Sequence, residues 1–222
     1  MISLITLIKL NPLRKCDDMT VQSVYVLNRA IDGKQITGMP DFESMHISEL
    51  LVDAYKEELL REGFLKDKGN LTTNGAKIVS RIRDYKESTK FIFLNNIIIG
   101  KKDDGRAVSL LYNPLYDEYK FTRIKLPDDY NDFLDSYSFF DSIVDSEENT
   151  IGEMNQNEFE LKYGDVKDNV LRFSICGNNI ERKYVIYVKE GKAYLYNINE
   201  RSASNVGKRE IVDLIKGEFK NE

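Results

Sequence analysis

The chain has 222 residues, of which 41% are hydrophobic and 31% are charged, as in an ordinary soluble globular protein. Its formal net charge is −5, which argues against a nucleic-acid binder, because a basic surplus supplies most of the affinity of such proteins for phosphate. No segment approaches the ~18 apolar residues of a membrane span, so we expect a protein that does not bind membranes. Two cysteines in unrelated contexts fit reduced thiols and a cytoplasmic location.

The first eighteen residues begin with "MISLITLIKL", which lacks the basic start of a signal peptide and is broken by Lys9. We expect residues 1–18 to be an N-terminal extension or an edge strand, with the folded part beginning near Met19. Thr20 can cap a first helix, because the apolar residues that follow recur at helical spacing.

Two more helices are expected before residue 90. One fits Ser48 to Glu62, where apolar residues recur at i, i+3, i+4 and i+7, and Gly63 ends it. The other runs from Asn74 to Lys86, capped by Thr72 or Thr73.

At residue 90 the pattern changes to that of strands. "KFIFLNNIIIG", "RAVSLLYN" and "EYKFTRI" are rich in β-branched and aromatic residues and are separated by the turns "KKDDG" and "NPLYD". "LPDDYNDFLDSYSFF" returns to a helical pattern. The polar segment 141–157 is expected to be a linker.

After the linker the same order returns. "NVLRFSICG", "RKYVIYVKE" and "KAYLYNI" are expected strands, "NERSASNVG" a loop, and "KREIVDLIKGEF" a helix with a broad apolar face. The order strand, turn, strand, hairpin, strand, loop, helix therefore occurs twice, at an offset of roughly 74 to 79 residues.

We therefore predict an α+β fold. Its antiparallel sheet would consist of two three-stranded meanders related by a pseudo-twofold axis, with helices on one face and a helical N-terminal segment. The expected division is a helical segment plus first meander at 19–140, the linker, and a second meander with its helix at 158–222, all within one compact domain.

No motif for chemistry is present, so we expect neither an enzyme nor a cofactor nor a metal site. The single histidine, His46, lies in a Gly/Pro-rich loop, where it is most often a solvated side chain. Cys16 and Cys176 have no Cys or His near them at metal-ligand spacing, which favours two reduced thiols. No phosphate-binding glycine motif and no nucleophile elbow occurs.

Thirteen tyrosines, several of them in or beside expected strands, are explained mainly by packing across a sheet. The loop "YNPLYD" differs, because its Pro114, Leu115 and Tyr116 are apolar at a turn where polar residues are less costly. A tyrosine-rich sheet with such a loop is also typical of a protein-binding surface.

The stretch Gly63 to Glu87 supports an alternative function. A short apolar end, a polar turn and a helix carrying Lys77, Arg81, Arg83 and Lys86 are typical of winged-helix transcriptional regulators. The same pattern also fits a plain amphipathic surface helix, whose apolar side would carry Ile78, Val79 and Ile82.

The runs "MTVQSVYVLNRAI" and "ELLVDAYKEELLREGFLKDKGNLTTNGAKIVSRI", followed by a strand, a charged turn and "GRAVSLLYN", resemble the EspG family of cytosolic type VII (ESX) secretion chaperones. The resemblance is one of pattern from Met19 onward, and the final helix is shorter than the C-terminal helical region usual in the family. It implies a quasi-twofold repeat and a non-enzymatic protein that keeps a helical-hairpin secretion substrate soluble. In that family a loop between strands and C-terminal helices contact the client, which by position implies these partner-binding residues: Tyr112, Pro114, Leu115, Tyr116, Ile211 and Ile215.

Overall fold

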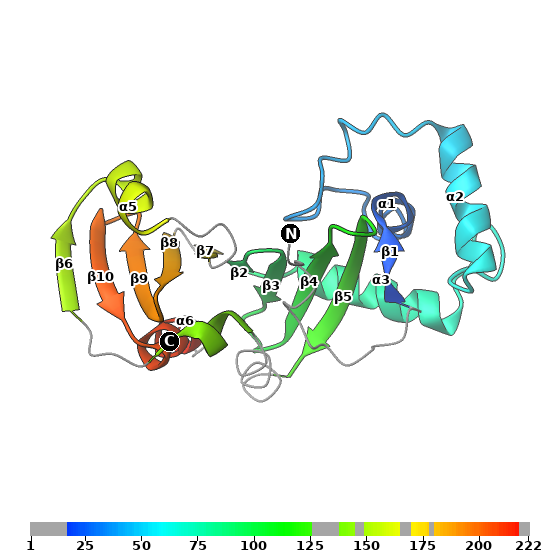
Figure 1. Cartoon of the computed structure of the whole chain (residues 1–222). Coiled ribbons are helices and arrows are strands. Elements are labelled where there is room, and N and C mark those ends of the chain that lie inside the picture. Colours follow the sequence, from blue (N-terminus) through cyan, green and yellow to red (C-terminus); the bar gives the residue numbers. More distant parts are fainter. Residues whose placement is uncertain (1–16, 126–137, 145–148, 165–169, 178–179, 218–222) are drawn as a thin grey trace. The chain divides into compact units, whose positions relative to one another are not determined.

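The structure is a computed structural model that describes residues 17–125, 138–144, 149–164, 170–177 and 180–217 (Figure 1). It divides into two compact units. The helical unit comprises Pro12–Thr89 and Asn96–Ile124, and the sheet unit comprises Met1–Asn11, Lys90–Asn95 and Lys125–Glu222. Neither unit is therefore one continuous stretch of chain.

The helical unit contains four strands in the order β1 (Met19–Thr20), β5 (Glu118–Ile124), β4 (Ala107–Asn113) and β3 (Ile97–Lys101), and each neighbouring pair is antiparallel. Helix α3 (Thr73–Lys86) packs across β3, β4 and β5 (Figure 1). Its Tyr85 ring meets the Phe121 ring edge-on, with the centroids 5.5 Å apart. The core of the helical unit lies between α3 and its own strands β3, β4 and β5.

Two further helices complete the helical unit, α1 (Val21–Asn28) and α2 (Glu49–Arg61). The expected cap at Thr20 is confirmed, and Thr72 rather than Thr73 caps α3, since each hydroxyl accepts a backbone N–H of the following turn. Ser48, expected as the first residue of its helix, is instead the cap of α2. Helix α2 packs mainly on α1. Only Val52 and Leu59 of α2 are fully buried, so most of this helix faces solvent.

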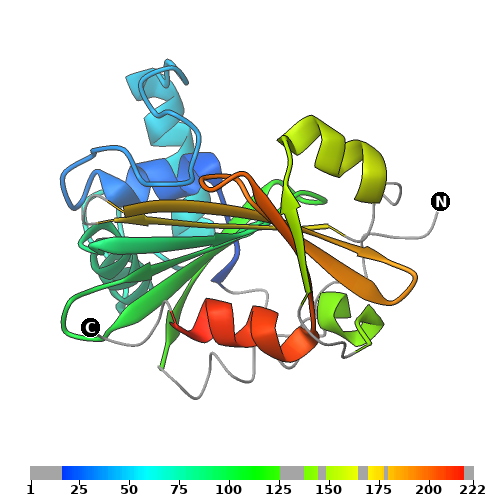
Figure 2. The same ribbon diagram turned by 90° about the vertical axis from the view of Figure 1, so that its left-hand side faces the viewer.

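The sheet unit contains six strands. Their order is β2 (Lys90–Leu94), β7 (Val170–Gly177), β8 (Ile180–Lys189), β9 (Lys192–Asn197), β10 (Ser202–Val206) and β6 (Asn149–Glu153), with antiparallel neighbours throughout. The unit also has a short 3-10 helix, η3 (Ser138–Ser142), and the helices α5 (Gln156–Tyr163) and α6 (Lys208–Gly217). Figure 2 shows α5 and α6 on opposite sides of this sheet rather than on the one face expected.

Aromatic side chains fill the space between α5 and the sheet. Phe159 is fully buried and stacks on Tyr196 of β9 at a centroid distance of 5.0 Å. Tyr163 stacks on Tyr194 at 4.1 Å. These tyrosines serve packing, as the sequence predicts for most of them.

The expected strand "KFIFLNNIIIG" is two strands, β2 and β3, separated by a turn at Asn95 and Asn96. Asn95 has a φ of +50°, a left-handed conformation that asparagine tolerates better than most residues. Its side chain accepts the Arg172 N–H and donates to the Val170 carbonyl of β7. Asn96 instead exchanges two hydrogen bonds with Tyr112 of β4.

Two other segments also differ from expectation. Strand β10 forms inside the expected loop "NERSASNVG", so a strand intervenes between β9 and the final helix. Strand β6 and the start of α5 occupy part of the expected linker at 141–157. The helix expected around Tyr130 to Tyr137 lies outside the described residues.

The predicted α+β class with antiparallel strands is confirmed. The described chain contains no helix with the length and apolar character that crossing a membrane requires.

Candidate functional site

The β4–β5 hairpin ends in a tight loop at residues 114–117. Asn113 pairs with Glu118 at the end of the ladder, and its side chain accepts the Leu115 N–H at 3.1 Å. Asp117 completes the turn in a left-handed conformation, with φ at +53°. The backbone of the loop is thus held by local hydrogen bonds.

This loop projects two large apolar side chains into solvent. Leu115 is 63% exposed and Tyr116 is 72% exposed, while Pro114 beside them is also exposed. A turn favours polar residues, so adjacent exposed apolar side chains on an ordered loop are typical of a contact surface. We call Pro114, Leu115 and Tyr116 the hairpin tip.

Tyr112 lies beneath the hairpin tip and supports it. Its ring packs on the Tyr119 ring with the centroids 4.9 Å apart, and its hydroxyl donates to the Asp117 carboxylate at 3.2 Å. This hydrogen bond, with lesser contributions from burial and from the Asp117 charge, raises the pKa of Tyr112. The Tyr112 hydroxyl thus helps to hold the Asp117 end of the loop in place.

The final helix does not provide the expected partner-binding residues. Ile211 and Ile215 are 1% and 0% exposed and belong to the core of the sheet unit. The apolar face of α6 packs inside the sheet unit, as is usual for an amphipathic helix of a globular protein, so it is not available to a partner. Four of the six expected residues, Tyr112, Pro114, Leu115 and Tyr116, lie together at the hairpin, and the two isoleucines lie in the other unit.

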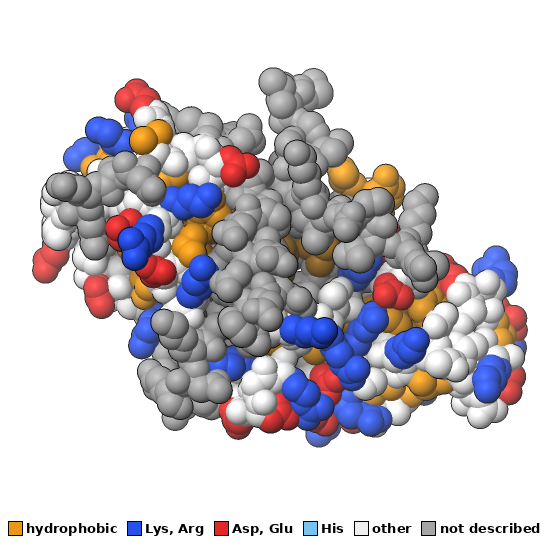
Figure 3. All heavy atoms as spheres, turned by 90° about the horizontal axis from the view of Figure 1, so that it is seen from below, with side chains coloured by type: hydrophobic (Ala, Val, Ile, Leu, Met, Phe, Trp, Pro, Cys, Tyr) orange, Lys and Arg blue, Asp and Glu red, His pale blue; other side chains and the backbone are white. Residues whose placement is uncertain are grey.

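Helix α3 carries the basic residues that favoured a DNA-binding regulator, and two of them bond to other parts of the same chain. Arg81 donates to Asp17 at 2.9 Å, and Lys86 bonds Asp32 and the side chain of Asn28. Lys77 and Arg83 are exposed. Figure 3 shows one face on which several Lys and Arg side chains lie close together, with Asp and Glu side chains beside them.

A buried carboxylate on the same helix is also satisfied by cations. Asp84 is 8% exposed and accepts two hydrogen bonds from Arg123, the shorter of them 2.7 Å. Arg106 and Lys102 lie 3.5 Å and 3.9 Å from its other oxygen. The cluster joins α3 to β5 and the β3–β4 turn, and removing its cations would leave the buried Asp84 carboxylate unpaired.

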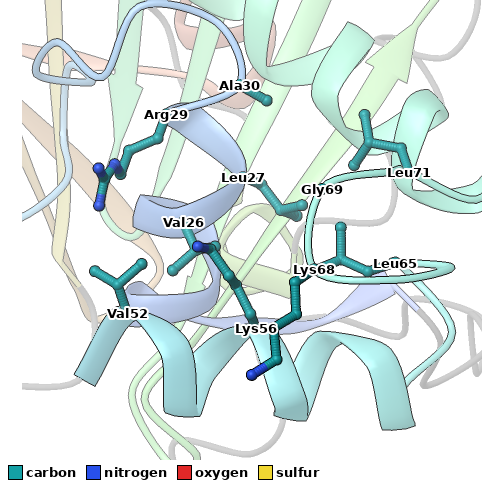
Figure 4. Close-up of a pocket in the computed structure, with 10 residues that line it drawn as sticks. All are labelled: Val26, Leu27, Arg29, Ala30, Val52, Lys56, Leu65, Lys68, Gly69 and Leu71. Carbon is teal, nitrogen blue, oxygen red and sulfur yellow. The ribbon is translucent and has the colours of Figure 1, made fainter. Parts of the chain in front are cut away.

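A pocket of about 220 Å³ opens in the helical unit between α1, α2 and the turn at 65–71 (Figure 4). Sequence reasoning missed it, because its walls come from three segments that are separated along the chain. Figure 4 shows the Lys56 side chain extending from α2 toward α1, and that of Lys68 reaching back toward α2. The lining residues are Val26, Leu27, Arg29, Ala30, Val52, Lys56, Leu65, Lys68, Gly69 and Leu71.

The groups most often used in catalysis are dispersed. His46 is exposed in its loop, and Cys176 is a free thiol in β7, whereas Cys16 lies outside the described residues. Within the described ranges, no three His, Cys, Asp or Glu side chains are close enough to form a metal site. The hairpin tip and the pocket are therefore the candidate sites for binding.

One protein-family model matches residues 14–216, and its description is a domain of unknown function, DUF5081. No curated protein matches the chain.

Proposed function

The chain belongs to the DUF5081 family, and we propose that it is a non-enzymatic adaptor that binds a protein client through the hairpin tip. The exposure of Leu115 and Tyr116 on an ordered loop carries this proposal. Covering them with an apolar surface of a client would be favourable by ~25 cal/mol per Å² buried, before the costs of association.

The client that fits best is a helical-hairpin protein that exposes an apolar tip. This choice follows the resemblance to EspG-type secretion chaperones, and it assigns the protein to the cytoplasm, where it would keep a type VII substrate soluble. By position along the chain, the hairpin tip is the nearest match to the client-contacting loop that the resemblance implies. The two adjacent exposed side chains offer an apolar surface that the apolar tip of such a client can cover.

The proposal includes the repeat that the resemblance implies. We propose that β2–β5 and β7–β10 are the two corresponding runs, since each is a succession of four antiparallel strands. Their strands begin 80 to 85 residues apart, so this pairing replaces the predicted three-stranded repeat at an offset of roughly 74 to 79 residues. In this pairing β10 corresponds to β5. The sequence alone predicted a loop at β10 and therefore gave it no counterpart. Failure of the two runs to superpose strand by strand would contradict this relation.

Co-purification with a helical-hairpin protein encoded beside this chain tests the client assignment. We expect Leu115→Asp to abolish capture of the client, because it places a charge in an apolar contact. The fold is expected to persist, since the side chain is largely exposed.

Leu161→Asp is the matched control, because Leu161 is 84% exposed on α5 and lies outside the hairpin tip. It should capture the client as the wild type does. Equal capture by Leu115→Asp and wild type would refute the hairpin tip as the docking surface.

A further inference from the structure

The pocket beside α2 has an apolar floor and a cationic lining. Leu27 and Val52 are almost fully buried, and Leu65 and Leu71 continue the floor from the turn. Arg29, Lys56 and Lys68 also line the pocket, and no carboxylate does. The lining itself is therefore cationic, although the carboxylates that pair with these side chains lie close outside it.

Each of the three cations has a carboxylate partner outside the pocket lining. Lys68 lies 2.9 Å from Glu57, Lys56 lies 3.3 Å from Asp53, and Arg29 lies 3.0 Å from Glu49. The Lys68, Arg29 and Lys56 side chains are 59%, 42% and 29% exposed, so the Lys68 and Arg29 pairs are the more exposed ones. Exposed ion pairs of this kind contribute little to stability, so an incoming carboxylate can share or replace these partners at low cost.

The pocket size limits the class of ligand. Sites for drug-sized ligands and cofactors occupy roughly 300–1,000 Å³, and this pocket at about 220 Å³ is smaller. It matches one bulky apolar side chain, the kind of anchor that dominates the binding energy at protein interfaces. Its ammonium groups complement acidic residues on either side of such an anchor.

We propose that this pocket is a second docking point, which receives an acidic segment of a partner protein presenting one bulky apolar side chain. The apolar side chain enters the floor between Leu27, Val52 and Leu71, and flanking carboxylates contact Lys56 and Lys68. The inference rests on the proposed function in one respect, namely that the occupant is a protein segment.

A display library of nine-residue peptides, selected on the full chain, tests the proposal. We expect the recovered sequences to share one Phe, Leu, Met or Trp flanked by Asp or Glu. Fluorescence anisotropy of the synthesised peptides then measures their affinity for the wild type and for variants.

Two variants change the pocket itself. Ala30→Leu places a larger side chain at the lining and is expected to weaken binding about tenfold or more, as for loss of an anchor contact. Lys68→Gln removes one lining charge and should weaken binding about threefold and reduce its dependence on salt. The controls Ala76→Leu and Lys66→Gln alter exposed positions outside the lining and should stay within about twofold of the wild type.

Thermal unfolding of every variant verifies that the fold is intact. Peptides that bind Ala30→Leu as tightly as the wild type, or a selection that recovers no acidic peptide with an apolar anchor, would overturn the proposal. Leu115→Asp is expected to leave peptide affinity unchanged, so a failure of this inference and a failure of the hairpin tip as a docking surface are distinguishable.

Discussion

Gly75 lies near the start of α3, where the helix meets the backbone of Phe64. A Cβ at this position would lie 2.1 Å from the Phe64 carbonyl oxygen. That oxygen also accepts the Thr72 N–H at 2.9 Å, so it is not free to move away. The absence of a side chain at Gly75 therefore determines how closely the turn at 65–71 approaches the helix.

We predict that Gly75→Ala lowers the free energy of unfolding by about 1–3 kcal/mol through overpacking, although alanine is favoured over glycine within helices by about 1 kcal/mol. Urea denaturation measures the change. Gly69→Ala is the control, since its Cβ would meet no atom closer than 3.7 Å. Equal stability of the two variants would contradict the close contact.

Asp104 gives a residue-scale prediction about pH. Hydrogen bonds from the Arg106 side chain, and secondly from its backbone, lower the pKa of Asp104 from 3.8 to about 2. A carboxyl with a lowered pKa stabilises the folded state above its unfolded pKa, and this contribution is lost as the pH falls from about 4 toward 2. Carbon NMR of the labelled Asp104 carboxyl should show a titration midpoint near pH 2. Arg106→Gln should move this midpoint toward 3.8. An unchanged midpoint in that variant would exclude the Arg106 side chain as the cause.

At the scale of elements, one lysine connects α3 to the loop after α1. The Lys86 ammonium donates to the Asn28 side chain at 2.9 Å and to the Lys34 carbonyl at 3.0 Å, and it also bonds Asp32. The Lys86 side chain is only 11% exposed. These contacts order a loop that has no helix or strand of its own.

We predict that Lys86→Met lowers the free energy of unfolding by about 1–3 kcal/mol, because it leaves the Asn28 oxygen without its charged donor. The same change should raise the pKa of Asp32, which the Lys86 hydrogen bond lowers. Lys77→Met on the exposed face of α3 serves as the control for denaturation and NMR titration. A stability loss in the control as large as in Lys86→Met would show that the loop contacts are not the reason.

Elements with a local signal were predictable from sequence. Thr20 and Thr72 each precede an apolar period of 3.6, and each caps a helix at that position. The division between β2 and β3 was not predictable, because Asn95 and Asn96 interrupt a run that is apolar on both sides. Strand β10, "SASNV", has few apolar residues and obtains its order from hydrogen bonding to β9 and β6.

The candidate sites also differ in whether the sequence alone could predict them. Leu115 and Tyr116 could be selected from sequence, since apolar residues at a turn are a local anomaly. The pocket could not, because it depends on the packing of α2 against α1 and the turn. The prediction that Ile211 and Ile215 bind a partner was wrong. An apolar helix face has the same sequence pattern whether it packs in the core or binds a partner.

At the scale of the molecule, the chain leaves the helical unit after Thr89 and returns to it at Asn96. The helices α1, α2 and α3 therefore precede most of the sheet on which α3 packs. Helix α3, whose Ile78, Val79 and Ile82 side chains are buried, packs mainly on β3, β4 and β5.

We predict that a fragment of residues 17–89 does not unfold cooperatively, whereas a fragment of residues 17–125 does. Three helices without their sheet cannot bury enough apolar surface to offset the loss of chain entropy. Circular dichroism during urea denaturation distinguishes a sigmoidal transition from a gradual one. A sigmoidal transition of the shorter fragment would mean that the helices form a core of their own.

The adjacent residues Asn95 and Asn96 are fastened to different strands, the first to β7 and the second to β4. No residue lies between these two, so the chain cannot lengthen here without moving one of them from its strand. An inserted residue would turn the side chains of one flanking strand to the opposite face of its sheet, since side chains alternate with a period of two. Among family members we therefore expect differences in length to accumulate in turns such as residues 102–106 and to be absent between these two asparagines.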